Sequence, residues 1–210
     1  MKRVLFTLSV LAALLGTAGC GFKTERTEKT EVSELTMSEM TNIDFLELAK
    51  GRYSVRKFSD KPVEQEVIDK ILEAGKVAPT AANIQPQKIY VLRSEEAMQI
   101  ANKLSPCIFG APQTFIICYD ANRACPRGEG NYGDIDCTIV LTHMMLEAWN
   151  LGVGTCMVGM FNADETRKAL NLPDNIHPVL FMPFGYPAPD ATPSAKHTDY
   201  RPLEETVEFR

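Results

Sequence analysis

The segment GRYSVRKF combines residue types that can bind phosphate. In an extended segment alternate side chains share a face, so we expect Arg52, Ser54 and Arg56 to converge. Tyr53 and Val55 would then pack on the opposite face. Guanidinium groups on either side of a hydroxyl match the charge and geometry of a phosphate. A surface strand with ion-paired arginines is the simpler interpretation of this segment alone, so other parts of the chain must decide.

The cysteines and histidines show no metal-binding spacing. Five cysteines follow Cys20 without a Cys-x-x-Cys pair, and the three histidines are scattered. Zinc sites use closer ligand pairs, so we expect no metal and interpret these cysteines as buried free thiols. In an oxidising compartment one disulfide, such as Cys107 with Cys125, remains possible.

Two glycine-containing stretches imitate nucleotide-binding motifs. GEGNYG, residues 128–133, has the spacing G-x-G-x-x-G but lacks a strand directly before it and an acidic residue about 20 positions later. GTCMVGM, residues 154–160, has Met160 where a P-loop requires lysine. We therefore expect a mobile loop at the first stretch and no P-loop at the second.

Composition restricts the class of protein. The chain has 210 residues, 45% of them hydrophobic, which suffices for one ordinary domain with a sizeable core. A net charge of -5 and a pI near 5.3 argue against nucleic acid as a partner, because nucleic acid binding needs a basic surface. No apolar run approaches the roughly 20 residues that span a bilayer.

Residues 1–19 have the pattern of a signal peptide. Lys2 and Arg3 precede an apolar run at residues 4–15, whose length is typical of secretory signals. TAGC follows, and small residues directly before Cys20 resemble the lipidation site of bacterial lipoproteins. We therefore expect an exported protein, lipidated at Cys20, that faces the periplasm or the cell exterior.

Three segments are therefore expected in the domain organisation. The signal peptide precedes residues 20–41, which comprise the lipidated cysteine and a polar tether of mixed charge. The domain would cover residues 42–210. Translation from Met37 or Met40 would instead give a cytoplasmic form of the same domain.

Hydrophobic periodicity predicts interleaved helices and strands in the domain. Thr41 and Asp44 resemble a capping box for the first helix, and Ser94 and Asn162 are expected to cap two others. Helices are predicted at residues 43–50, 64–77, 94–104, 134–150 and 162–172, and strands at 88–93, 114–119, 155–160 and 178–186. The fourth helix begins at either Asp134 or Asp136. This order favours an α+β layered domain.

Three features of the domain predict how its parts pack: the helix at 134–150, Pro183 in the last strand, and the tail after that strand. The helix at 134–150 is apolar around much of its circumference, so we expect its own domain or a partner subunit to enclose it. Pro183 in the last strand predicts an edge or a bulge. The tail that follows is rich in proline and is predicted to be an arm lying on another surface.

Five segments in consistent order resemble the nitroreductase family of FMN-dependent oxidoreductases. They are RYSVRKF, APTAANIQPQ, LGVGTCMVG, PVLFMPFGYPA and YRPLEETV, within about residues 42–210. The resemblance implies a three-layer α/β/α sandwich around a small mixed, mainly antiparallel sheet. It also implies a homodimer with FMN at the subunit boundary and a C-terminal arm that wraps the partner subunit.

The same resemblance answers the question raised by the arginine segment. It implies that Arg52, Ser54 and Arg56 hold the phosphate and the ribityl chain of FMN. Arg201 matches a tail arginine of the family that reaches the same phosphate.

The resemblance also implies contacts to the flavin ring. Thr80 and Asn83 would approach the isoalloxazine from the partner subunit. Met157, Val158 and Gly159 match a backbone run beside the ring, where main-chain amides act as donors. This chain has Gln87 and Met157 where the family often has tryptophan, which affects the expected substrate preference more than flavin binding.

The implied activity is hydride transfer from NAD(P)H through FMN to a nitroaromatic, a quinone or a similar acceptor, by a ping-pong mechanism. No catalytic side chain is expected, because the flavin carries the chemistry. An exported protein meets little NAD(P)H, so either the donor differs or the cytoplasmic form is the true one. The alternatives are a flavin-binding or flavin-modifying protein, and a non-catalytic envelope lipoprotein.

Overall fold

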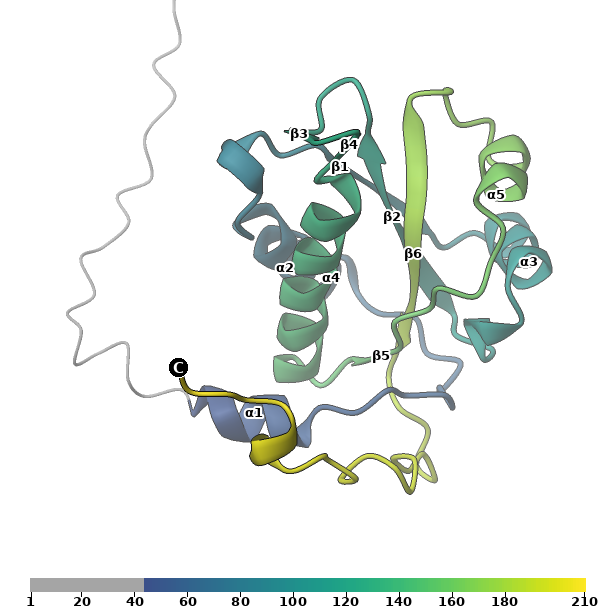
Figure 1. Ribbon diagram of the computed structural model, residues 1–210. Coiled ribbons are helices and arrows are strands. Elements are labelled where there is room, and N and C mark those ends of the chain that lie inside the picture. Colours follow the sequence, from purple (N-terminus) through teal and green to yellow (C-terminus); the bar gives the residue numbers. More distant parts are fainter. Residues whose placement is uncertain (1–43) are drawn as a thin grey trace, which may run out of the picture. The chain divides into compact units, whose positions relative to one another are not determined.

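A computed structural model describes residues 44–210 of the chain (Figure 1). The predicted signal peptide, the proposed lipidation site Cys20, the tether and the proposed cap Thr41 lie outside the described residues. Within the described range no helix is both long and apolar enough to cross a membrane.

A four-stranded sheet forms the middle layer. Its strands are β1 (Gln87–Leu92), β2 (Gln113–Asp120), β6 (Ile176–Gly185) and β5 (Gly154–Thr155), in that spatial order. All three ladders are antiparallel, and one isolated parallel bridge joins Ser54 to Thr155. The predicted α+β fold with a mainly antiparallel sheet is therefore confirmed.

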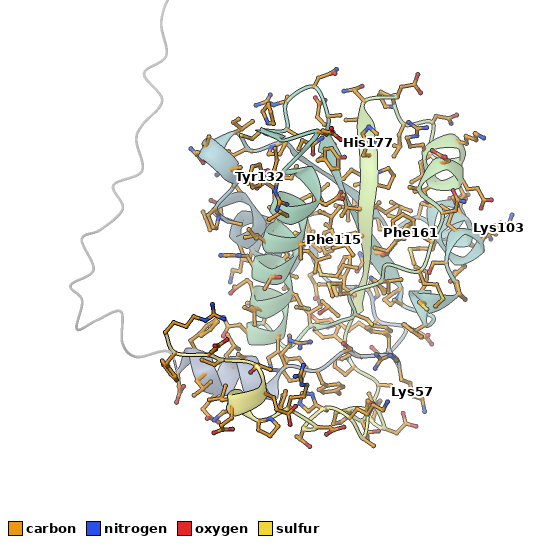
Figure 2. All side chains as sticks on the ribbon, in the orientation of Figure 1. Lys57, Lys103, Phe115, Tyr132, Phe161 and His177 are labelled. Carbon is orange, nitrogen blue, oxygen red and sulfur yellow. The ribbon has the colours of Figure 1, made fainter. Side chains whose placement is uncertain are left out.

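Two helices cover each face of this sheet (Figure 1). α2 (Gln65–Lys76) and α4 (Gly133–Asn150) pack on one face, and α3 (Glu95–Leu104) and α5 (Ala163–Ala169) on the other. Each face has its own apolar core. Phe115 belongs to the core under α2 and α4, and Phe161 packs against the other core (Figure 2). These are the three layers that the sequence predicted.

Pro183 marks neither an edge nor a bulge, so that prediction was wrong. β6 lies between β2 and β5, and the register shift after Ile117 falls beside Pro178. The Pro183 carbonyl accepts a hydrogen bond from the Cys156 N–H at 3.2 Å. In an antiparallel pair the N–H that proline lacks would face the same side, toward the Cys156 carbonyl. Pro183 thus removes the reciprocal bond, and β5 ends at Thr155, just before this pair.

Local capping explains where several helices begin. Asp44 caps α1 (Phe45–Gly51), since its carboxylate accepts the Glu47 N–H at 3.1 Å. Asp44 is thus the cap itself and not the second residue of the expected capping box. Ser94 caps α3 by accepting the Ala97 N–H at 3.2 Å, as predicted.

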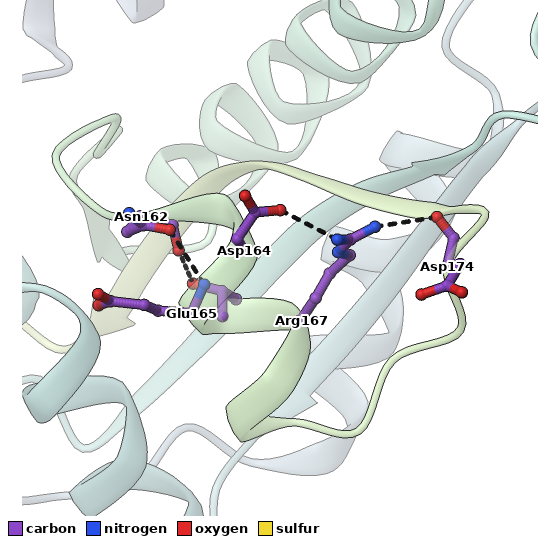
Figure 3. A network of polar contacts seen from close by, with 6 residues as sticks. Asn162, Asp164, Glu165, Arg167 and Asp174 are labelled. Atoms are coloured by element: carbon purple, nitrogen blue, oxygen red, sulfur yellow. Dashed lines mark hydrogen bonds and ion pairs between the residues drawn. The ribbon is translucent and has the colours of Figure 1, made fainter.

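A polar network fixes α5 and the loop after it (Figure 3). Asn162 caps the helix by accepting the Glu165 N–H at 3.0 Å, as predicted. Arg167 then donates to Asp164 at 3.0 Å and to the Asp174 carbonyl at 3.1 Å. The helix ends at Ala169, earlier than predicted, because the chain turns back toward β6 through these contacts.

The G-x-G-x-x-G stretch forms a small hairpin and not a strand–turn–helix unit. Its strands are β3 (Pro126–Arg127) and β4 (Gly130–Asn131), with Gly128 at φ 56° in the turn. The dinucleotide-binding interpretation is excluded by this geometry. Short 3-10 turns complete the domain at Ala81–Asn83, Pro106–Ile108 and Leu203–Glu205.

Candidate functional site

The arginine segment lies along the short strand β5. The Val55 N–H donates to the Thr155 carbonyl at 2.9 Å, and Ser54 forms the parallel bridge to the same residue. This pairing keeps the segment extended, so neighbouring side chains point to opposite faces. Val55 is fully buried, whereas Arg52, Ser54 and Arg56 remain accessible. The predicted alternation holds for Val55, whereas Tyr53 is only half-buried and lines the same hollow as the three polar residues.

Arg52, Ser54 and Arg56 line one hollow of about 290 Å³, called the cationic hollow below. Tyr53 and three residues of the tail, Ser194, Lys196 and His197, complete its lining. Three permanent positive charges therefore surround the space, and none of its lining residues carries a carboxylate. Such a space suits an anion with several acceptor oxygens.

Aromatic contacts hold the tail beside the arginine segment. The His197 Nε2 lies 3.1 Å from the Lys50 carbonyl oxygen, and the His197 ring is 6.1 Å from the Tyr53 ring. Tyr53 in turn packs edge-on against Trp149 near the end of α4, at 5.1 Å between ring centroids. The sequence had no periodic signal for this part of the proline-rich tail, so Lys196 and His197 were missed.

Arg201 is not among the residues that line the cationic hollow. Its Nε donates to the Glu205 carboxylate at 3.0 Å, and its Nη2 donates to the Glu205 carbonyl at 3.1 Å. The guanidinium is thus held within the arm of its own chain. Lys196 is the tail cation that the structure brings to Arg52 and Arg56.

A second hollow, of about 200 Å³, shares Arg56 with the first and is called the amide hollow below. Met157, Val158 and Gly159 form one wall. The Val158 N–H already donates to the Phe181 carbonyl at 2.9 Å. Within residues 44–210 the N–H groups of Met157 and Gly159 have no such partner, so these two are the available donors.

The Cys156 thiol, which lines the amide hollow, is not activated as a nucleophile. Burial raises the pKa of the Cys156 thiol, and the nearby Arg56 guanidinium and Ser54 hydroxyl oppose this only in part. A thiol with a raised pKa stays protonated at neutral pH and is a poor nucleophile. All five cysteines of the described part are free, so the possible Cys107–Cys125 disulfide is absent there. No cluster of three or more His, Cys, Asp or Glu suited to a metal occurs among residues 44–210.

The loop that contains Thr80 and Asn83 has an unusual backbone. Ala82, Asn83 and Gln85 have φ values of 51°, 54° and 54°. Each left-handed non-glycine residue costs about 1–2 kcal/mol, and such strain is concentrated at functional sites. The Gln85 N–H donates to Thr80 Oγ1 at 3.1 Å, and Gln85 Nε2 donates to Asn83 Oδ1 at 3.1 Å. These bonds hold both predicted site residues in one fixed arrangement.

Asp136 attaches this loop to α4. Its Oδ1 accepts the Ala81 N–H at 2.9 Å, and the residue is only 1% exposed. Its Oδ2 has no hydrogen-bond partner in the described part of the chain. The sequence indicated only that Asp136 begins a helix, because its contact with Ala81 links positions far apart in the chain.

The Thr80 loop and the arginine segment lie at opposite ends of α4 (Figure 1). Ala81 is bonded to Asp136 near the start of the helix, whereas Tyr53 packs on Trp149 near its end. At 1.5 Å per residue these two helical positions are roughly 20 Å apart. One copy of the chain therefore does not bring Thr80 and Asn83 to the two hollows.

The layered fold defines an α+β protein in which a hollow lined by three cations adjoins a hollow bordered by main-chain amides without a partner. Residues 49–110 and 99–186 match the model of the nitroreductase family. The chain belongs to the nitroreductase family, and hence to the oxidoreductases, as the sequence predicted.

Curated relatives agree with this assignment. A protein of Methanothermobacter thermautotrophicus named as an NADH dehydrogenase/NAD(P)H nitroreductase is 30% identical over 157 residues, covering 71% of this chain and 81% of the relative. An NADPH-dependent oxidoreductase of Staphylococcus aureus is 31% identical over 168 residues, covering 71% and 67% of the two chains.

Solved structures share the fold. A nitroreductase family protein of Clostridium difficile 630 superposes with a TM-score of 0.75 at 36% identity, over 80% of this chain and 98% of that one. A nitroreductase-type structure from Exiguobacterium sibiricum in complex with FMN has a TM-score of 0.68 at 19% identity, with the same coverage. At that identity the second likeness shows the fold alone.

Proposed function

We propose that this protein is an FMN-dependent oxidoreductase that passes hydride from NAD(P)H to a nitroaromatic, a quinone or a similar acceptor. The observation that carries the proposal is the pair of adjoining hollows that share Arg56. One is cationic and the other is bordered by free main-chain amides. FMN has the matching two parts, a phosphate and a planar ring that accepts hydrogen bonds.

The cationic hollow fits the phosphate end of FMN. Arg52 and Arg56 supply guanidinium forks, Ser54 a hydroxyl and Lys196 an ammonium group. Charge-assisted bonds of this kind contribute about 1.5–3 kcal/mol each, with the exposed ones at the lower end. Arg201 would have to exchange Glu205 for the phosphate in order to join them.

The amide hollow fits the edge of the flavin ring. The N–H groups of Met157 and Gly159 would donate to ring acceptors, while Val158 between them keeps its N–H in the sheet and its side chain in the core. Thr80 and Asn83 of the partner subunit would complete the site. Their distance from the hollows of their own chain is the reason to assign them to the partner.

A homodimer also explains several uncovered apolar residues. α1 has no buried residue, and its Phe45 and Leu46 are 61% and 60% exposed. Leu203 and Phe209 on the C-terminal arm are 72% and 95% exposed. Exposed apolar surface of this extent is typical of an interface. We propose that the arm wraps the partner subunit and that both surfaces become buried there.

In the proposed mechanism the protein holds FMN in position and supplies no reacting side chain. When bound, FMN would supply the hydride chemistry between NAD(P)H and the acceptor, and one site used by the two substrates in turn would give ping-pong kinetics. Arg52, Arg56 and Lys196 fix the phosphate, and the amides of Met157 and Gly159 fix the ring edge. No side chain is required as nucleophile, so substitutions in the hollows should weaken FMN binding before they change the chemistry.

An absorbance experiment tests the proposed function. Purified full-length protein loaded with FMN should be yellow and should bleach anaerobically on addition of NADPH or NADH. Initial rates at varied donor and acceptor should give parallel double-reciprocal lines. A yellow protein that does not bleach would indicate a flavin binder or another donor. A protein that takes up no FMN would contradict the proposal.

Assembly and location need separate measurements. Analytical ultracentrifugation should show a dimer, and a flavin-loaded monomer would contradict the shared site. We also propose that Cys20 is lipidated and anchors an exported protein to the membrane. Palmitate should then label the wild type but not Cys20→Ser. Absence of label from the wild type would favour the cytoplasmic form.

A further inference from the structure

A large hollow of about 870 Å³ lies away from the arginine segment and is called the distal hollow below. It is bounded by residues 83–88, by Asp120 and Arg123 at the end of β2, and by the segment 173–176 before β6. Its size is typical of pockets that bind small molecules. Neither the cationic hollow nor the amide hollow shares a residue with it.

The charge of this hollow favours an anion. Lys88 and Arg123 are its two cations, and neither forms an ion pair with any residue in the range 44–210. The one carboxylate, Asp120, already accepts from the Asn175 side chain at 2.7 Å and from the Asn122 N–H at 2.9 Å. Arg123 also donates to the Ile84 carbonyl at 3.5 Å, at the rim of the hollow. Two cations against one carboxylate leave the lining with a net positive charge, in a protein whose net charge is -5.

The hollow also offers a surface for a planar group. Tyr90 is half-buried in its wall, two residues from Lys88 on β1, so both side chains lie on the same face of the strand. An aromatic ring next to cations suits a ligand that combines a flat ring system with phosphate. A nucleotide has this chemistry.

The position connects the hollow with the proposed reaction. Its rim includes Asn83 and Gln85, the strained loop that in the proposed dimer meets the flavin ring of the partner subunit. A ligand that reaches from the flavin along this loop would place its far end near Lys88 and Arg123. The loop is held rigidly by Asp136, so the rim is preformed.

We propose that the distal hollow binds the adenosine phosphate end of the reduced nicotinamide dinucleotide. The inference rests on the proposed function for the donor at the flavin, and it assigns the remainder of that donor to Lys88, Arg123 and Tyr90. No bond is made or broken there. The hollow sets donor affinity and not the hydride transfer step.

The test separates the two ends of the donor. Adenosine 2′,5′-bisphosphate should bind the oxidised, FMN-loaded wild type in isothermal titration calorimetry. Lys88→Gln and Arg123→Gln should each weaken this binding about tenfold, because each removes one charge-assisted contact. Lys103→Gln is the matched control. Lys103 is an exposed lysine in the last turn of α3, outside the hollow (Figure 2).

Kinetics give a second readout. Both variants should raise KM for NADPH about tenfold with kcat and FMN affinity unchanged. With benzyl dihydronicotinamide, which lacks the adenosine end, their KM should equal that of the wild type. An equal loss with both donors would overturn the proposal, since the cations would then act on the flavin end.

The outcomes also distinguish this inference from the proposed function. Absence of adenosine bisphosphate binding in a wild type that NADPH bleaches would overturn the inference and leave the proposed function intact. Binding that depends on Lys88 and Arg123 in a protein that NADPH does not reduce would support a nucleotide site and contradict the proposed donor. Equal binding by wild type and both variants would overturn the inference.

Discussion

Gly154→Ala should loosen the arginine segment from its support. An added Cβ at this position would lie 2.5 Å from Val55 Cγ2 and 2.9 Å from Val55 Cβ. Carbon atoms pack best at about 3.5–4.0 Å, so the two segments must separate by roughly 1 Å. Val55 is fully buried and β-branched, which leaves it no alternative rotamer that relieves the contact.

The magnitude follows from this overlap. Overpacking of this kind costs about 1–3 kcal/mol, which lowers the Tm of a domain of this size by roughly 2–12 °C. Val55 lies between Ser54 and Arg56, so the shift also displaces two groups of the cationic hollow. Loss of one charge-assisted bond, about 1.5–3 kcal/mol, would weaken FMN binding roughly 10- to 150-fold.

Two assays follow the two effects. Thermal unfolding monitored by circular dichroism gives the Tm, and titration of apoprotein with FMN, followed by quenching of flavin fluorescence, gives the Kd. Gly130→Ala is the control, because the nearest atom to its added Cβ is the Arg127 carbonyl oxygen at 3.8 Å. A Gly154→Ala variant with lowered Tm but wild-type FMN affinity would refute the coupling between β5 and the phosphate site.

Three further predictions concern single positions. A Cβ added at Gly159 by Gly159→Ala has no atom within 4 Å, so the Tm should stay unchanged. The methyl group would lie where the flavin ring is proposed to bind, so the affinity for FMN should fall about tenfold. An unchanged affinity would mean that the ring binds elsewhere. Asp136→Ala leaves the Ala81 N–H unpaired, so the free energy of unfolding measured by urea titration should fall by about 1–3 kcal/mol. Asp136→Asn keeps an acceptor oxygen and should lose less stability. An equal loss of stability in the two variants would contradict this role of Asp136. Burial raises the pKa of Cys118 to about 12, so mass spectrometry after iodoacetamide treatment at pH 8 should find the more exposed Cys125 modified before Cys118; the reverse order would contradict this.

Local signals predicted much of the fold. Ser94 and Asn162 cap helices as expected, because a capping bond joins residues only three apart. The burial of Val55 was also predicted, because side chains alternate locally along an extended segment, but the place of Tyr53 in the hollow was not. The strand predicted at 155–160 does not form over that range, because β5 ends at Thr155 and Val158 rejoins the sheet only by a single bridge to Phe181.

The candidate site required information that periodicity does not contain. Lys196 and His197 reach the cationic hollow through an irregular tail, which His197 holds by an edge-on contact with the Tyr53 ring and a hydrogen bond with the Lys50 carbonyl. The bond from Asp136 to Ala81 joins two elements far apart in sequence. A single sequence shows neither contact, because both arise from tertiary packing and not from local preference.

The length of α4 has a genetic consequence for the proposed dimer. In that dimer each helix would support part of one flavin site at its end, through Trp149, and part of the other at its start, through the Asp136 bond. A subunit damaged at Arg56 and a subunit damaged at Asn83 would therefore complement each other when mixed. Half of the sites in such a hybrid would inherit both lesions, and the other half would be intact.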